Sequence, residues 1–478
     1  MSSTQLVVIG AGPGGYAAAY YAADLGMQVA LVDPEPNPGG VCLYRGCIPS
    51  KALLHVAKVM REARHASAWG VTFGEPRIDL DKLRGFKDQV VQKLTAGVGQ
   101  VGKFRKVNYV QGRASFASPT SLKIDLVSGG SDTLTFQHAI IATGSRPASV
   151  PGLSIDSPRV MDSTAALDLP DLPKTLLVVG GGYIGLELGS VYAALGTKVT
   201  VVEMTPGLLP GADRDLVAVL AKDMDRTVHQ VLLNARVVEM TDVKTGVKVR
   251  IDGEGLAPAD REQTFDRVLV SVGRKPNSAV PGLDKTRVAV DARGFIVVDA
   301  ARRTGEPAIF AIGDVVGEPM LAHKASHEAR VAVEAALGHN VAFEPQAIPA
   351  VVFTDPEVAW CGLTETEAKK QGRSVEVAKF PWAALGRAIA IDRPEGLTKL
   401  VIDPATERIL GVGMVGSGAG ELIAEGVLAV EMAALATDVK LSIHPHPTLS
   451  ETLMEAAEVF FGQSTHVYKP KRRASLSP

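Results

Sequence analysis

The chain has only three cysteines among its 478 residues, almost no net charge and no long apolar run. No stretch approaches the roughly 20 apolar residues that a membrane-spanning helix needs. A formal charge of −2 gives no reason to expect a general affinity for nucleic acid. Apolar residues make up 46% of the chain, which is enough for several cores, so we expect about two to four domains.

The ends of the chain offer few signals. Only Ser2 to Gln5 separate Met1 from the first expected strand, so we expect no secretory or transit leader and a cytoplasmic location. In that reducing compartment a permanent disulfide is not expected. Cys361 is expected to be a small buried hydrophobe. The basic segment 469–478 lacks periodicity and is expected to be disordered.

The other two cysteines, Cys42 and Cys47, stand four residues apart. A disulfide closing so short a loop would remove only roughly 2 kcal/mol of unfolded-chain entropy, so a structural role explains the pair poorly. Pro49 and the apolar residues after it predict a helix that begins beside the two sulfurs, where a thiolate is stabilised. We therefore predict a redox pair. A zinc site is not expected, because it would need two more ligands.

Two segments of the chain repeat one pattern of strand, glycine turn, helix, strand and acid. They run from Leu6 to Asp33 and from Leu176 to Glu203, and the matched glycines are Gly10, Gly12 and Gly15 in the first and Gly180, Gly182 and Gly185 in the second. The first glycine permits the turn, the second lets a pyrophosphate approach, and the third lets the helix pack on the strand. The acid would bind a ribose. The repeat predicts two dinucleotide sites.

The cysteine pair indicates which dinucleotide each site holds. Because the pair follows the first unit directly, the nucleotide bound there should exchange electrons with sulfur, and a flavin does this whereas a nicotinamide alone does not readily do so. We therefore expect FAD in the first unit and NAD in the second. Apolar strands within 139–147, 268–277 and 308–314 each end in glycine, and Asp314 is a candidate acceptor for the ribityl hydroxyls of the flavin.

A candidate base lies near the end of the chain, at His446. Pro445 and Pro447 flank it, and Glu451 follows five residues later, where a short helix can bring the carboxylate back to the ring. Such a carboxylate fixes the imidazole tautomer and raises its basicity. Dithiol oxidation needs a base, because a thiol with a pKa near about 8.5 must lose its proton to attack sulfur. His444 is the less favoured alternative.

With these residues assembled, the chain resembles the flavin-dependent pyridine nucleotide-disulfide reductases over residues 4–468. The segments that carry the resemblance are GGVCLYRGCIPSKALL at 39–54, GGGYIGLE at 180–187, AIGD at 311–314, LAHKA at 321–325 and HPHPTLSE at 444–451. It implies an α/β fold with two Rossmann-like dinucleotide-binding domains and a C-terminal α+β interface domain. The implied parts are an FAD-binding domain (1–149), an NAD-binding domain (150–272), a central domain that completes the FAD site (273–345) and the interface or dimerisation domain (346–468).

Within the family, the resemblance is to members that oxidise dihydrolipoyl groups with NAD⁺. It implies a homodimer in which His446 and Glu451 serve the cysteines of the opposite subunit, and a lipoyl-bearing partner from a 2-oxo acid dehydrogenase or glycine cleavage complex. Cys42 would exchange with substrate and Cys47 would face the flavin, beside an ion pair of Lys51 and Glu187. The implied cofactor contacts are, for FAD, Gly10, Gly12, Gly15, Asp33, Gly40, Lys51, Thr143, Gly144, Gly313, Asp314 and Ala322, and, for NAD, Gly180, Gly182, Gly185, Glu203 and Gly273.

Three other readings remain open. A glutathione-type reductase would share the cysteines but would carry basic residues for an NADP phosphate where this chain has Glu203-Met204. A mercuric reductase would have a C-terminal cysteine pair, and no cysteine follows Cys361. A flavoprotein redox sensor without turnover would not need Cys42, Cys47, His446 and Glu451 together. Asp33, where the family commonly has the longer Glu, is a departure from the pattern.

Overall fold

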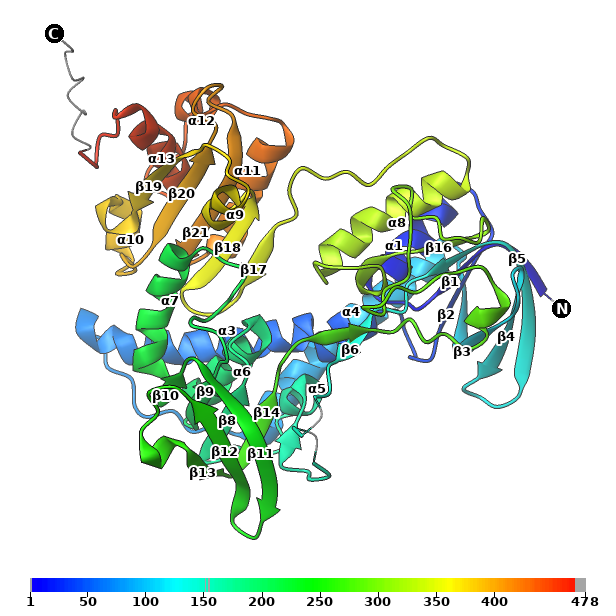
Figure 1. Cartoon of the computed structure of the whole chain (residues 1–478), viewed down its shortest axis with the longest axis horizontal. Helices are drawn as coiled ribbons and strands as arrows, with labels where there is room; N and C mark the ends of the chain where they lie inside the picture. Colours follow the sequence, from blue (N-terminus) through cyan, green and yellow to red (C-terminus); the bar gives the residue numbers. More distant parts are fainter. Residues whose placement is uncertain (1, 151, 154, 469–478) are drawn as a thin grey trace. The chain divides into compact units, whose positions relative to one another are not determined.

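The computed structural model describes residues 2–150, 152–153 and 155–468, so the tail predicted to be disordered lies outside the described residues. The chain divides into two compact units, each made of several segments. Unit 1 contains residues 1–56, 72–172 and 270–344, and unit 2 contains residues 57–71, 173–269 and 345–478. The chain therefore passes back and forth between the units (Figure 1). Among the described residues, no helix is long and apolar enough to cross a membrane.

Unit 1 is built on a parallel sheet with the strand order β3-β2-β1-β5-β16. The far ends of β3 and β5 continue into an antiparallel meander with β4. The strands are β1 (Ser2–Ile9), β2 (Val29–Asp33), β3 (Asn108–Ser118), β4 (Ser121–Leu126), β5 (Ser131–Ile141) and β16 (Ile309–Ala311). A separate ribbon joins β6 (Ser145–Pro147) to β15 (Arg274–Pro276).

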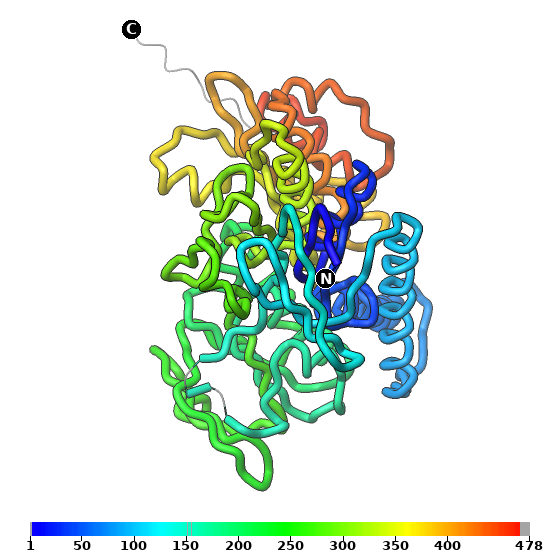
Figure 2. Tube along the Cα trace, turned by 90° about the vertical axis from the view of Figure 1, so that its right-hand side faces the viewer, coloured from blue at the N-terminus to red at the C-terminus, as the bar shows by residue number. Residues whose placement is uncertain are grey.

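Both faces of this sheet are covered, which explains why its strands are apolar on both sides. Helices α1 (Pro13–Asp24) and α8 (Ala322–Ala336) pack together over the face that carries Leu6 and Val8. Val7 and Ile9 point the other way, into a core completed by the β3–β5 meander. Figures 1 and 2 show α8, in yellow-green, beside α1, in dark blue, although most of the chain separates them. Unit 1 also contains α2 (Gly40–Arg45), α4 (Leu80–Phe104), α5 (Ser163–Leu167) and the first part of α3 (Cys47–His65).

Unit 2 contains a second open sheet, with the order β10-β9-β8-β14, and a C-terminal antiparallel sheet. The first has β8 (Thr175–Val179), α6 (Tyr183–Ala194), β9 (Lys198–Val202), α7 (Arg214–Thr227), β10 (Gln230–Leu232) and β14 (Arg267–Val270). A three-stranded antiparallel sheet is formed by β11 (Ala235–Val243), β12 (Gly246–Gly253) and β13 (Glu262–Phe265). The β8-α6-β9 unit repeats the arrangement of β1-α1-β2, as the sequence predicts.

The C-terminal sheet has the order β17-β18-β21-β20-β19 and is antiparallel throughout. Helices α11 (Ala419–Glu431), α12 (Ala436–Leu441) and α13 (Glu451–Phe461) complete its core with Trp382 and Phe380. The strands are β17 (Ala350–Val352), β18 (Glu357–Gly362), β19 (Glu376–Pro381), β20 (Leu397–Ile402) and β21 (Ile409–Gly416), and α9 (Glu365–Lys370) follows β18. The buried Cys361, in β18, is 1% exposed, as predicted. The architecture is therefore α/β with two Rossmann-like parts and a C-terminal α+β part, as expected.

Candidate active site

The first glycine turn joins β1 to α1. Glycine is needed at its three positions for different physical reasons. Gly10 has φ +96°, which a residue with a side chain rarely adopts. A Cβ at Gly15 would lie 1.8 Å from the Gly10 carbonyl oxygen, so close packing requires glycine there. Gly12 has ordinary extended backbone (φ −69°), and a Cβ on it would approach only Gly40, at 3.9 Å. Neither the backbone nor the packing explains Gly12, but a pyrophosphate lying over this turn does.

The second turn, between β8 and α6, shows the same distinction. Gly180 has φ +108°, and Gly185 is buried within α6. Gly182 has extended backbone (φ −79°), and a Cβ on it would meet no atom within 4 Å outside its immediate neighbours. The open space above each middle glycine fits a dinucleotide phosphate at the N-terminus of the helix.

Asp33 is the last residue of β2 and Glu203 directly follows β9, and both acids reach back to the glycine turns. Asp33 accepts hydrogen bonds from the N–H of Ala11, at 2.7 Å, and from the N–H of Glu35. Glu203 accepts equivalent bonds from Gly181, at 2.7 Å, and Thr205. Burial raises the pKa of Asp33, and the two N–H donors offset this only in part. Both acids are therefore held at the turns where a ribose would lie.

The two cysteines contact one another. Cys42 lies in α2, a short helix that the sequence did not predict, and Cys47 is the first residue of α3, two positions before Pro49. Proline is tolerated there because the first-turn N–H groups have no helical acceptor. A hydrogen bond with Cys47, together with burial and the charge of Cys47, raises the pKa of the Cys42 thiol strongly. Cys47 stands at a helix N-terminus, where a thiolate is stabilised.

Two further side chains of unit 1 act on this pair. The Lys51 ammonium lowers the pKa of Cys42 in part, against the larger effect of Cys47. Burial, and then the charges of Cys42 and Cys47, raise the pKa of Tyr16. Tyr16 belongs to α1 and follows the glycine turn, so the fold brings its ring toward the cysteines. Tyr16 was not predicted from the sequence, where its only signal is its position directly after Gly15.

The loops that end β5 and β16 come together in unit 1. Thr143 Oγ1 donates to the carbonyl of Asn277, and the Asn277 amide donates to the carbonyl of Thr143, at 3.0 Å. Ser145 Oγ donates to Asp314 and accepts from Arg274. Gly144 and Gly313 both have positive φ, so tight turns expose Thr143 and Asp314 at the carboxyl ends of parallel strands. That edge is where ligands bind in open α/β sheets.

Glu328, on α8, fixes the Gly313–Asp314 turn and was not predicted from the sequence. It is fully buried and accepts a hydrogen bond from the N–H of Gly313 at 2.6 Å. Lys324 and Arg302 supply the compensating charges, at 3.0 and 3.1 Å. Ala322 is the first residue of the same helix. In the sequence, only the neighbouring LAHKA segment at 321–325 indicated that this part of the chain belongs to the site.

His446 and Glu451 form a hydrogen-bonded pair in unit 2. His446 Nδ1 lies 2.9 Å from Glu451 Oε1, and Glu451 Oε2 accepts the N–H of Thr448 at 2.8 Å. Burial alone would raise the pKa of Glu451, but the Thr448 and His446 contacts outweigh it, and the net pKa lies below the usual value. The His446 side chain is 74% exposed, so a carboxylate orients an imidazole that a thiol can reach.

The neighbouring His444 has a different environment. Its side chain is only 6% exposed, its Nε2 lies 2.7 Å from Glu425, and its Nδ1 lies 2.9 Å from the carbonyl of Ser442. Both nitrogens are engaged, so this histidine is built into the loop. The structure therefore separates the two imidazoles that the sequence left as alternatives.

Glu187 is also part of unit 2 and is 3% exposed, with its carboxylate accepting the N–H of Phe353 at 3.0 Å.

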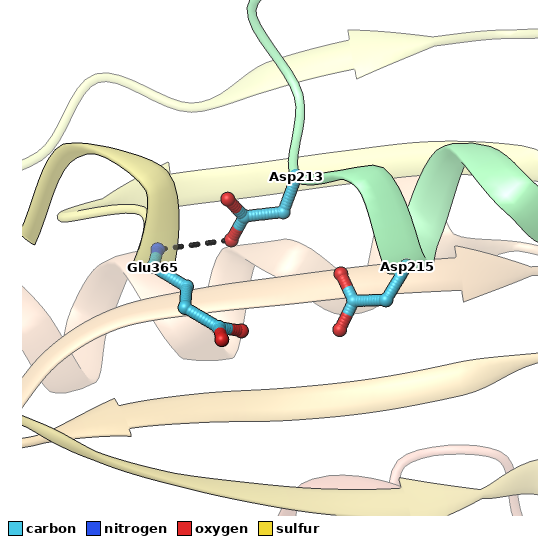
Figure 3. A group of neighbouring side chains, drawn as sticks. All are labelled: Asp213, Asp215 and Glu365. Atoms are coloured by element: carbon cyan, nitrogen blue, oxygen red, sulfur yellow. Dashed lines mark hydrogen bonds between the residues drawn. The ribbon is translucent and has the colours of Figure 1, made fainter. Parts of the chain in front are cut away.

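Elsewhere in this unit Asp213, Asp215 and Glu365 lie close together (Figure 3). The buried Lys399 Nζ lies 2.8 to 3.0 Å from all three carboxylates, and Lys379 Nζ lies 2.7 Å from Asp215, so two cations offset most of the negative charge. This cluster ties α7 and α9 to β20 and is a structural ion-pair network.

Two turns shaped for dinucleotides, a contacting cysteine pair and an imidazole–carboxylate pair define a dinucleotide-dependent oxidoreductase that acts on thiols. The chain belongs to the pyridine nucleotide-disulphide oxidoreductase family: residues 4–329 match that family, and residues 348–457 match its dimerisation domain. It uses FAD and NAD as cofactors, and the match to the dimerisation domain supports a homodimer.

Similar proteins cover nearly the whole chain. It is 48% identical to a dihydrolipoyl dehydrogenase of Haemophilus influenzae, over 99% of this chain and 98% of that protein. It is 47% identical to a dihydrolipoyl dehydrogenase of Vibrio cholerae, over 98% of each. Among solved structures, LpdA from Mycobacterium tuberculosis superposes with a TM-score of 0.88 at 27% identity, over 96% of this chain and 99% of that one.

Proposed function

We propose that this protein oxidises protein-bound dihydrolipoyl groups to lipoyl groups and passes the electrons through Cys42 and Cys47 to FAD and then to NAD⁺. The observation that carries the proposal is the sulfur–sulfur contact at the start of α3, in the unit that holds the first glycine turn. The full-length relatives named dihydrolipoyl dehydrogenase support the choice of substrate.

The proposed reaction starts from the Cys42–Cys47 disulfide. His446 takes the proton of one substrate thiol, and the resulting thiolate attacks Sγ of Cys42. The bond between the two cysteines breaks, and Cys47 leaves as a thiolate. The second substrate thiol then displaces Cys42 from the mixed disulfide and gives its proton to Cys42. The products are the substrate disulfide, a Cys42 thiol, a Cys47 thiolate and one proton on His446.

The chemistry that bound FAD supplies is acceptance of the electron pair of this dithiol and its delivery as hydride to NAD⁺. The residues of the chain prepare that step. Cys47 stands at the N-terminus of α3, where a thiolate is stabilised, which supports Cys47 as the sulfur that faces the flavin. Lys51, whose charge reaches Cys42, supports the assignment of a cation beside the same pair. We assign Glu187 as its counter-ion.

The cofactor contacts follow the two repeated units. We assign FAD to the turn of Gly10, Gly12 and Gly15, with Asp33 on its ribose, and NAD to the turn of Gly180, Gly182 and Gly185, with Glu203 on its ribose. Further FAD contacts are assigned to Gly40, Lys51, Thr143, Gly144, Gly313, Asp314 and Ala322, and a further NAD contact to Gly273. The domain limits proposed from the sequence, at 149, 272 and 345, follow from the same assignment.

The assembly we propose is a homodimer in which His446 and Glu451 serve the cysteines of the other subunit. The substrate would arrive on a lipoyl-bearing protein of a 2-oxo acid dehydrogenase or glycine cleavage complex, in the cytoplasm. Mixing His446→Gln subunits with Cys47→Ser subunits tests the arrangement, because a mixed dimer regains one complete site only if the residues come from different chains.

The proposed function is tested by NAD⁺ reduction with free dihydrolipoamide against reduced glutathione, using the full chain with FAD bound. We expect NADH only with dihydrolipoamide, and no product from the Cys47→Ser variant. Cys361→Ala is the matched control, because this third cysteine is buried in β18, and it should keep its activity. Turnover with glutathione, or none with dihydrolipoamide, would overturn the proposal.

A further inference from the structure

Helix α13 carries a second imidazole–carboxylate pair, one turn beyond Glu451. Glu455 is 3% exposed and follows Glu451 by four residues, so the two acids share one face of the helix. The Nδ1 atom of His466 lies 2.5 Å from Glu455 Oε1. Ser464 Oγ donates to Glu455 Oε2 at 2.7 Å. Both oxygens of a buried carboxylate are thus bound by the segment that follows the helix.

That segment, residues 463–467, is a strap fastened back onto the domain. The N–H of Val467 donates to Ser464 Oγ, and the Val467 side chain packs against the C-terminal core. Lys440 Nζ, on α12, donates to Gln463 Oε1 at 3.0 Å. His466 is therefore held over α13 by several contacts, yet its side chain is 50% exposed and can exchange protons with water.

Three acids, Glu451, Glu455 and Glu458, lie about one turn apart on this face of α13. Burial, and then the charge of Glu455, raise the pKa of Glu458. The charge of His466 acts on both neighbouring acids of the helix. It opposes the rise in the pKa of Glu458 and helps to lower the pKa of Glu451. The charge of His466 thus acts on the carboxylate that holds His446.

Within residues 155–468, few other charges near α13 could replace His466. Lys440 is the cation that faces this end of α13 from α12. From β19, Glu376 lies on the same face of the strand as the core residues Ala378 and Phe380, which is the face that α13 covers. Lys379 of β19 and Lys399 of β20 bind carboxylates of α7 and α9 instead.

We propose that His466 is a positioning residue that neutralises Glu455 and thereby sets the basicity of the His446–Glu451 pair. While His466 is protonated, its pair with Glu455 has no net charge, and a neutral His466 leaves one negative charge beside Glu451. This inference rests on the proposed function, in which His446 takes the proton of the substrate thiol.

The sign of the effect follows from charge. Removing the cation with His466→Gln leaves Glu455 unneutralised, which favours the protonated form of His446 and moves the acid limb of the pH profile to higher pH. Removing the anion with Glu455→Gln leaves the cation alone and moves that limb to lower pH. A single charge about one helical turn away, screened by water, corresponds to a shift of about 0.5 pH unit in each direction.

The experiment measures kcat/KM for dihydrolipoamide against pH for the wild type, the two single variants and the double variant. We expect opposite shifts in the single variants and a wild-type midpoint in the double variant. Ser464→Ala is the matched control, because it loosens the strap without changing a charge, and it should lower the thermal stability but leave the midpoint in place. Shifts in the same direction, or none, would overturn the proposal.

The failure of this inference can be told apart from that of the proposed function. If the wild type does not oxidise dihydrolipoamide, the same four proteins are titrated by NMR of their histidine ring protons. The resonance that disappears in His446→Gln should still move in opposite directions in the two single variants. A His446 titration that is identical in all four proteins would refute the coupling, whatever the substrate.

Discussion

His446 Nδ1 lies 2.9 Å from Glu451 Oε1, and the same carboxylate accepts the N–H of Thr448 with its other oxygen. Glu451 is thus fixed at both oxygens before it orients the ring. The imidazole that it holds is 74% exposed in the single chain, whereas the side chain of His444 is 6% exposed and bound at both nitrogens.

His446→Gln should therefore reduce dithiol oxidation by roughly 10²- to 10⁴-fold, which is the usual contribution of a positioned base, with the fold and bound FAD retained. Glu451→Gln should lose less, because the ring keeps a hydrogen-bond partner but loses the charge of the carboxylate beside it. Steady-state kinetics with dihydrolipoamide checks both. If His444→Gln were inactive and His446→Gln had nearly wild-type activity, the base would be His444 and not His446.

Cys42→Ser and Cys47→Ser should both stop turnover but differ in the absorption spectrum of the FAD-loaded protein. We expect the thiolate on Cys47, because this residue stands at the N-terminus of α3. Cys42→Ser therefore keeps a thiolate at the proposed flavin face and should show a long-wavelength charge-transfer band, while Cys47→Ser should show none. A band in Cys47→Ser alone would reverse the two roles.

Glu203 should make the enzyme prefer NAD⁺ over NADP⁺ by at least about 10²-fold in kcat/KM, because a carboxylate at about 4 Å from a phosphate costs roughly 4 kcal/mol at an effective dielectric near 20. The carboxylate is already positioned by the N–H groups of Gly181 and Thr205. Kinetics with both nucleotides gives the ratio, and Glu203→Arg should narrow it. Equal use of the two by the wild type would rule out this role for Glu203.

Gly182→Ala should weaken nucleotide binding without destabilising the fold. A Cβ at Gly182 would meet no atom within 4 Å, so only a bound pyrophosphate would be displaced, and we expect KM for NAD⁺ to rise by about 10-fold or more. Gly181→Ala is the contrast, because its Cβ would lie 2.7 Å from Leu208 and should lower the melting temperature. An unchanged KM in Gly182→Ala would place the phosphate elsewhere.

Asp213 should contribute stability that is lost in acid. Burial would raise its pKa, but Lys399, Thr366 and the N–H of Glu365 outweigh this and lower it to about 2. Because the folded pKa lies below the unfolded value of about 3.9, the contribution of about 1–2 kcal/mol is complete above about pH 4 and disappears as the pH falls toward 2. The free energies of unfolding of Asp213→Asn and wild type, measured with urea, should therefore differ most at pH 6, differ less at pH 3 and converge toward pH 2. Asp132→Asn is the control, because Asp132 is exposed. Its free energy of unfolding should differ little from that of the wild type at any of these pH values.

The sequence predicted the parts of the fold that depend on local pattern. The glycine turns, their flanking strands and their acids follow from the repeat, and the core position of Cys361 follows from its apolar neighbours. The helix after Cys47 was also predicted, although it begins at Cys47 itself.

Other features could not be predicted, because they depend on contacts between distant residues. Glu328 is fixed by Arg302 and Gly313, and Lys399 by carboxylates from α7 and α9. Spacing along the chain does not reveal such partners. For the same reason the C-terminal histidine of the strap gave no signal, since its meaning depends on the buried Glu455.

The strand order of unit 1 has a consequence for biosynthesis. Strand β16 pairs with β5, yet it is made long after it, when the strands β8, β9 and β10 of the second glycine unit have already been synthesised. Because the ribosome releases the N-terminal part first, a nascent chain carries an unpaired edge on β5 until residues 309–311 emerge. We therefore expect the second glycine unit to complete its sheet first, and the interval before β16 emerges to be the stage at which chaperones protect the growing chain.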